Sequence, residues 1–103
     1  MFSMALTVQI IDKVKVFLDS CSSSDRAKIV AAITVMEAGT IEMVVTRQIS
    51  GSIRELKVKQ YRILYFQHES ILYFVGGFTK KSQKTPLREI ENAKQIRKII
   101  TQK

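Results

Sequence analysis

The stretch that decides the fold reads Gly76-Gly77-Phe78-Thr79-Lys80-Lys81-Ser82-Gln83-Lys84-Thr85-Pro86. An apolar run typical of a β-strand precedes it, and a segment with helical periodicity follows it. The two glycines predict a bend in the backbone, and the proline, the only one in the chain, suits the start of a helix because it has no N–H to pair. Three lysines lie between these residues, and the stretch contains no acid. We therefore expect either a solvated loop or a segment that holds an anion.

Three short runs rich in Ile, Val, Leu, Tyr and Phe precede this stretch, at residues 53–59, 61–67 and 70–75. Such runs, with tight breaks between them, predict three consecutive strands in an antiparallel meander. After the stretch, apolar residues recur at helical spacing over residues 87–100, which predicts a C-terminal helix.

The first half of the chain predicts mainly helices. Residues 2–8 favour a short strand, with a helical start as the alternative, and helical periodicity then runs from Ile10 to Ser20. A second helix is expected to end at Gly39, a residue typical of the position just after a helix. Residues 40–52 carry only weak signals and read as a connector.

The junction between the two predicted helices contains Ser22 and Asp25, which have the spacing of a capping box. In that arrangement each side chain accepts a hydrogen bond from the backbone N–H of the other residue. Because only a few residues separate the two helices, we expect an antiparallel helical hairpin.

These elements predict a single α+β domain over residues 1–103. Its helical hairpin packs on a small antiparallel sheet, which is a three-stranded meander with a possible extra N-terminal strand, and a C-terminal helix follows. Helices on one face of such a sheet would leave the other face free.

The composition is that of an ordinary globular protein, with 46% apolar and 25% charged residues. No stretch is long and apolar enough for a membrane span, and the apolar opening lacks the basic start of a signal peptide. The single cysteine, Cys21, excludes an internal disulfide, and no Cys/His cluster is spaced to hold a metal. We expect a cytoplasmic protein without metal or other cofactor, in which Cys21 is inert.

The net charge of +8 belongs entirely to the second half of the chain. Residues 1–53 carry five cations and five acids, whereas residues 54–103 carry twelve cations and four acids. This asymmetry favours a polyanionic partner such as nucleic acid, and a solubilising surface is the alternative.

Alternation along the predicted strands brings several cations to one face. Arg62 lies among apolar residues and must find an anion or reach water, and Lys57 could meet it on the neighbouring strand, although the sequence leaves the register open. The lysines Lys80, Lys81 and Lys84 leave the last strand and could close over the same surface. Such a site would hold a phosphate without a metal, which suits RNA cleavage by attack of the ribose 2′-hydroxyl.

That reaction also needs a general base and a general acid. Glu55 is the only carboxylate in the basic strand region, and the alternative is that it pairs with Lys57 or Arg62. His68 is the only histidine, and its place in a predicted hairpin loop favours a solvated role. Tyr65 is either a sheet-packing residue or a platform on which a base stacks.

Three segments then suggest a family, namely residues 54–57 (Arg-Glu-Leu-Lys), 61–66 (Tyr-Arg-Ile-Leu-Tyr-Phe) and 77–86. Together they resemble the phage-derived Gp49-like, HigB-type branch of the RelE/ParE toxin superfamily. The helix after Pro86 and residues 16–20 also fit, so the resemblance covers most of the chain.

The resemblance implies the toxin of a bacterial or phage toxin–antitoxin pair, which cuts mRNA on the ribosome in the cytoplasm without a metal. It implies a cognate antitoxin, usually a small helix-turn-helix protein, in a hetero-oligomer with the toxin, and no membrane partner. Two alternatives stay open: a ParE-like inhibitor of DNA gyrase, which shares the fold, and a basic nucleic-acid-binding module.

By position, Arg62 matches a phosphate-binding arginine of the family, and Lys80 or Lys81 falls where a second cation is expected. The strand lysines of the better-studied RelE members fall on Ile53 and Glu55, and their C-terminal tyrosine has no counterpart after Tyr73. The acid and base are therefore not carried over. The candidate catalytic residues are Arg62, Lys80, Lys81, Lys57 and Glu55, and the candidate RNA-binding residues are Lys59, Lys84, Arg54 and Tyr65.

Overall fold

A computed structural model describes residues 6–102 of the chain. Its centre is a five-stranded sheet in the order β1-β5-β4-β3-β2. The strands are β1 (Thr7–Ile10), β2 (Val45–Ser50), β3 (Ile53–Val58), β4 (Tyr61–His68) and β5 (Ile71–Thr79). The predicted meander is confirmed as β3, β4 and β5, which pair antiparallel.

One edge strand of the sheet was not predicted, and the other edge is the possible N-terminal strand of the prediction. Residues 40–52, read as a connector, contain a short 3₁₀ helix (Ile41–Met43) and the antiparallel edge strand β2, so that reading is wrong. The N-terminal strand exists as β1, but it pairs parallel to β5, so the sheet is mixed. Residues 2–5 of the predicted N-terminal strand lie outside the described part of the chain.

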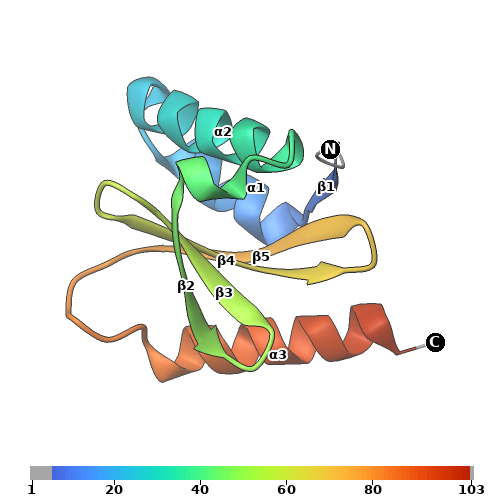
Figure 1. Cartoon of the computed structure of the whole chain (residues 1–103). Helices are drawn as coiled ribbons and strands as arrows, with labels where there is room; N and C mark the ends of the chain where they lie inside the picture. The colour runs from blue at the N-terminus through green and yellow to red at the C-terminus, as the bar shows by residue number, and fades with distance from the viewer. Residues whose placement is uncertain (1–5, 103) are drawn as a thin grey trace.

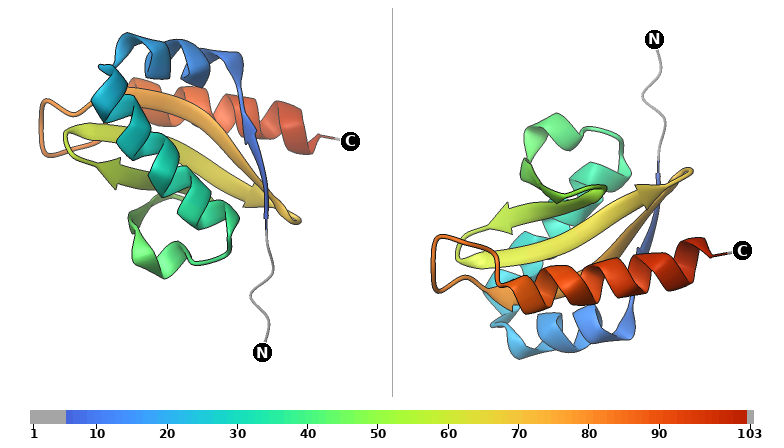
Figure 2. Two further views of the ribbon diagram at one scale, coloured as in Figure 1. Left: turned by 90° about the horizontal axis from the view of Figure 1, so that it is seen from above. Right: turned by 90° about the horizontal axis from the view of Figure 1, so that it is seen from below.

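Helices cover both faces of the sheet. Helices α1 (Asp12–Ser20) and α2 (Ser23–Glu37) lie on one face and α3 (Leu87–Thr101) on the other, as Figure 1 shows. The expectation of a free face is therefore wrong. Figure 2 shows that α1 and α2 diverge from their short connection as they cross the sheet. Among residues 6–102, no helix has the length and apolar character needed to cross a membrane.

Two separate cores result from this layering. The larger lies under α1 and α2 and is built around Val14, Leu18, Ile29, Ile33, Met36, Leu56, Ile63, Tyr65, Leu72 and Phe74. The smaller lies under α3 and contains Ile53, Leu64, Phe66, Val75 and Ala93. All six residues at 61–66 are buried because β4 is central and covered on both sides.

The start of α2 has half of the predicted capping box. The Ser22 hydroxyl accepts the backbone N–H of Asp25 at 3.1 Å, as expected. The Asp25 carboxylate does not complete the box, because it accepts hydrogen bonds from Lys59 and Tyr61 across the layer. At the other end of α2, Gly39 has φ of +87°, which confirms the predicted glycine after the helix.

The paired glycines allow close packing instead of bending the chain. Both lie within β5, which continues to Thr79, and Gly77 faces the ring of Phe17 on α1. A Cβ at Gly77 would lie 2.5 Å from Phe17 Cδ2, so only glycine lets α1 approach this closely. Phe17 in turn packs edge-on against Tyr61, with ring centroids 6.0 Å apart.

This packing predicts that alanine destabilises the protein at Gly77 but has little effect on stability at Gly76. Gly77→Ala should lower the free energy of unfolding by about 1–3 kcal/mol because the ring of Phe17 must move. Gly76→Ala is the matched control, since its Cβ would meet Leu64 at an ordinary 3.7 Å. Urea unfolding of the two variants measures the difference, and equal stabilities would contradict the close approach of α1 to β5.

Candidate functional site

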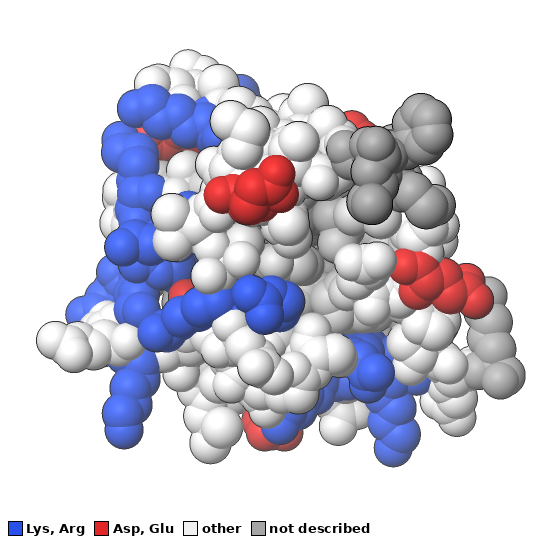
Figure 3. Space-filling model, viewed as in Figure 1, with Lys and Arg blue, Asp and Glu red and all other residues white. Residues whose placement is uncertain are grey.

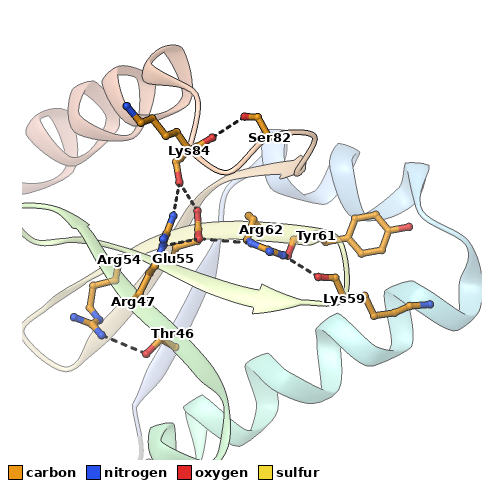
Figure 4. Close-up of polar contacts among 10 residues, drawn as sticks. Thr46, Arg47, Arg54, Glu55, Lys59, Tyr61, Arg62, Ser82 and Lys84 are labelled. Carbon is orange, nitrogen blue, oxygen red and sulfur yellow. Dashed lines mark hydrogen bonds and ion pairs between the residues drawn. The ribbon is translucent and has the colours of Figure 1, made fainter.

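A buried carboxylate lies at the centre of the candidate site. Glu55 on β3 is 2% exposed, and its Oε1 lies 3.3 Å from Arg47 Nε and 3.6 Å from Arg62 Nε. Its Oε2 accepts a hydrogen bond of 2.7 Å from Thr85 Oγ1. Figure 4 shows Arg47 from β2 and Arg62 from β4 pointing toward Glu55. Of the two roles considered for Glu55, the structure shows the pairing with Arg62.

The guanidinium of Arg62 is fixed by the backbone of the turn that precedes it. Its side chain is 9% exposed, and its Nη1 donates to the carbonyl oxygens of Lys59 at 2.8 Å and Tyr61 at 2.9 Å. The β3–β4 register, which the sequence left open, places Arg62 directly opposite Lys57. The group is therefore held as a preorganised cation on the α3 face of the sheet.

The β3–β4 turn also holds the start of the lysine-rich loop, which is the connection between β5 and α3 at residues 80–86. The backbone N–H of Lys80 donates to the carbonyl of Gln60 at 2.7 Å, between the two carbonyls that hold Arg62. Lys59 has φ of +54°, a conformation that residues other than glycine adopt only when surrounding contacts hold it. One turn thus positions both Arg62 and Lys80.

Those contacts come from α2, in the opposite layer. Asp25 accepts hydrogen bonds from Lys59 Nζ at 2.8 Å and from Tyr61 Oη at 2.7 Å. The bond from Lys59, with that from Tyr61, lowers the pKa of Asp25, while the bond to Asp25 raises the pKa of Tyr61 to about 12. Asp25 therefore clamps the two residues whose carbonyls orient Arg62.

A pocket of about 220 Å³ opens beside Arg62. Four cations and one carboxylate line it, together with Val45 and Thr46, and the charged residues are Arg47, Glu55, Lys57, Arg62 and Lys80. Since Glu55 is engaged by Arg47, Arg62 and Thr85, the excess positive charge faces the pocket. This arrangement can hold an anion such as a phosphate.

The structure brings together part of the predicted site. Arg62, Lys57, Lys80 and Glu55 meet at the pocket. Lys81 and Lys84 are exposed in the loop that follows, and neither lines this pocket.

The other predicted RNA contacts lie elsewhere. Lys59 is paired with Asp25. Arg54 lies on the α1/α2 face of the sheet, where it donates to Tyr65 Oη and Thr46 Oγ1. Tyr65 is 1% exposed in the larger core, so its ring offers no face on which a base could stack, and the structure corrects that expectation.

Three residues of the site were missed by sequence reasoning. Arg47 lies in the stretch read as a connector, where only Val45 and Ile49 are apolar at strand spacing, which is a weak strand signal. Thr85 and Asp25 were assigned to a loop and a cap, and no local pattern indicates their partners 30 or more residues away.

Two other candidates lie apart from the pocket. His68 ends β4, six residues and roughly 20 Å along the strand from Arg62. Cys21 is half-buried, and burial raises the pKa of its thiol, which disfavours the reactive thiolate. Within residues 6–102, no three His, Cys, Asp or Glu side chains gather where they could hold a metal ion.

Comparison with known proteins identifies the family. The sequence model of the family described as "Phage derived protein Gp49-like" matches residues 16–98. The chain is a member of the Gp49-like family. No curated protein matches it.

The fold of this Gp49-like protein is also found among solved structures. The E. coli toxin RelE, solved in the free state as a double arginine-to-alanine mutant, is similar with a TM-score of 0.65 and 15% sequence identity. The similarity covers 90% of this chain and 98% of the RelE chain. The family model confirms the predicted Gp49-like family, and the solved structure shows that the chain has a RelE-like fold.

The buried ion pair predicts that Glu55 matters for stability. Glu55→Gln should lower the free energy of unfolding by about 3 kcal/mol, because it leaves the Arg62 guanidinium buried without its carboxylate. Glu91→Gln, at an exposed position on α3, is the control. The double variant Glu55→Leu/Arg62→Met should recover most of the loss in denaturant unfolding, and a double variant as unstable as Glu55→Gln would contradict this account.

The clamp by Asp25 predicts a change in the titration of Tyr61. Asp25→Asn should lower the pKa of Tyr61 from about 12 toward the ordinary value near 10, visible in the ultraviolet absorbance of tyrosinate. Because folding raises this pKa, the contribution of the bond to stability is complete below pH 10 and disappears as the pH rises through 12. Asp19→Asn, an exposed carboxylate near Arg26, should leave the titration unchanged.

Proposed function

We propose that this Gp49-like protein is the toxin of a type II toxin–antitoxin pair and that it cleaves mRNA on the ribosome. The observation that carries the proposal is the pocket beside Arg62, in which a fixed guanidinium and the amines of Lys57 and Lys80 surround a space sized for a phosphate. Membership of the Gp49-like family and the RelE fold support the same reading.

In the proposed reaction, the ribose 2′-oxygen attacks the adjacent phosphorus, and the bond from phosphorus to the 5′-oxygen breaks. The products are a 2′,3′-cyclic phosphate and a free 5′-hydroxyl. Arg62, Lys57 and Lys80 stabilise the charge that builds up on the phosphoryl oxygens, an effect worth about 10²–10³-fold for one fixed donor. Lys80 or Lys57 gives a proton to the leaving 5′-oxygen, and the 2′-hydroxyl loses its proton to water.

The residues that line the pocket support dependence on the ribosome. Both oxygens of Glu55 are engaged, and the other lining residues include no carboxylate or imidazole that could serve as a base. A site that mainly stabilises charge needs a substrate whose 2′-oxygen is already positioned to attack the phosphorus. We infer that mRNA held in the ribosome provides this geometry, and that the protein acts in the cytoplasm.

The partner in this proposal is a cognate antitoxin, a small helix-turn-helix protein that forms a hetero-oligomer with the toxin. Co-expression of a neighbouring reading frame of that type should restore growth during induction.

The test is induction of the protein in bacteria, with primer extension on a translated message. Wild type should arrest growth and leave cleaved mRNA, and Lys57→Ala/Lys80→Ala should lose at least about 10²-fold in cleavage. Arg62→Lys, which keeps the charge but lacks the forked donor, should also be impaired. Lys13→Ala, on the exposed side of α1, is the matched control, and circular dichroism checks the fold.

Two outcomes would overturn the proposal in different ways. Growth arrest with intact messages would refute RNA cleavage, and an accompanying DNA damage response would favour a gyrase inhibitor. RNA binding with steep salt dependence but neither cleavage nor arrest would leave a plain nucleic-acid-binding module.

A further inference from the structure

The edge strand β2 and the turn after it line three hollows in succession. The first is the pocket beside Arg62, which residues 45–47 line. The second, of about 360 Å³, lies between residues 47–49 and residues 83–85 of the lysine-rich loop. The third, of about 340 Å³, lies between residues 50–53 and the second half of α3. Consecutive segments of chain therefore connect the proposed active site to α3.

The three hollows have nearly uniform positive charge. Glu55 is the one carboxylate among the residues that line them. Eight of the 17 Lys and Arg residues of the chain also line them, namely Arg47, Lys57, Arg62, Lys80, Lys84, Lys94, Arg97 and Lys98. A hollow of similar size on the other face, between β1 and α2, is lined by one cation and one acid, Lys15 and Glu37. The positive charge is thus a property of the β2 side. Figure 3 shows Lys and Arg along one edge of this face and again below, toward α3.

The third hollow has hydrogen-bond donors suited to the phosphates of a nucleic-acid backbone. Lys94, Arg97, Lys98 and Thr101 follow the spacing of one helical face, so they point toward the same side. The guanidinium of Arg97 also lies 5.9 Å from the centre of the Phe66 ring, which anchors it on the core. Opposite these residues, Ser50 and Ser52 bring hydroxyl groups on the turn around Gly51.

The lining residues also indicate how a ligand would be recognised. None of the residues around the three hollows is aromatic, so no ring is available on which bases could stack. Cations and hydroxyls contact phosphate oxygens and sugars, and such contacts position a nucleic acid without reading its sequence.

We propose that single-stranded RNA lies along β2, with one phosphate beside Arg62 and later phosphates at Lys84 and at Lys94, Arg97 and Lys98. This inference extends the proposed function, because it names the path of the substrate beyond the cleavage pocket. β2 has six residues and spans roughly 20 Å, so a strand of several nucleotides is needed to reach from the first hollow to the third. Shorter RNA contacts the first hollow alone.

The experiment measures binding of 2′-O-methyl RNA, which lacks the attacking hydroxyl and is not cut, by fluorescence anisotropy across a salt series. The variant is Lys94→Gln/Lys98→Gln, which removes two exposed charges and leaves Arg97 on Phe66. The matched control is Lys13→Gln/Lys28→Gln, which removes two exposed charges from α1 and α2. Each protein is tested with a trinucleotide and with a single strand of about ten nucleotides.

The α3 variant should bind the longer RNA about tenfold more weakly and lower the slope of log K against log salt by about 1.4, the value for two lost contacts to single-stranded RNA. Its affinity for the trinucleotide should equal that of wild type, and the control should match wild type with both. Equal effects of the α3 and control variants, or an equal loss with both RNA lengths, would overturn the path along β2.

The outcome also separates this path from the proposed function. If Lys57→Ala/Lys80→Ala abolishes cleavage while the α3 variant binds long RNA normally, the path fails and the nuclease stands. If the α3 variant loses long RNA but wild type cuts no message, the path stands and the nuclease fails.

Discussion

The Glu55 carboxylate is the interaction on which the rest of this molecule depends. A buried charge is costly unless paired and hydrogen-bonded, and Glu55 meets that requirement with groups from three other segments. Arg47 comes from β2, Arg62 from β4 and Thr85 from the loop before α3. A single side chain therefore fixes the edge strand, the central arginine and the end of the lysine-rich loop.

The same carboxylate limits what the site can do. Because its oxygens contact Arg47, Arg62 and Thr85, Glu55 serves to hold these groups in place. The pocket is consequently suited to stabilising negative charge, and it offers little acid–base chemistry of its own.

Much of the fold could be predicted from local patterns. The meander and the three helices follow from periodicity and alternation, and the Ser22 cap follows from the spacing of Ser22 and Asp25. The sequence allowed Lys57 to meet Arg62, and the register of β3 and β4 decides that it does. The strand β2 was missed because an edge strand in which four of six residues are polar has a weak signal. The placement of α3 on the second face was missed as well, although the unbroken apolar character of residues 61–66, apart from Arg62, indicated a strand covered on both sides.

The site was less predictable than the fold because its contacts join residues far apart in the sequence. Arg62 was identified from its apolar surroundings, whereas the clamp by Asp25 joins residues 34 and 36 positions apart. Tyr65 and Arg54 were misplaced although each lies three residues along its strand from Arg62 or Lys57. Alternation therefore puts both on the face opposite the pocket.

The contact between Thr85 and Glu55 also has a consequence for the order of events during synthesis. The lysine-rich loop is translated after every other segment that contributes to the pocket. Lys80 attaches the start of the loop to the β3–β4 turn, and Thr85 attaches its end to Glu55 on the sheet. A growing chain that has reached only β5 lacks this attachment, and its arginines and carboxylate are not yet enclosed. The cationic pocket is therefore completed late, when most of the chain has already been made.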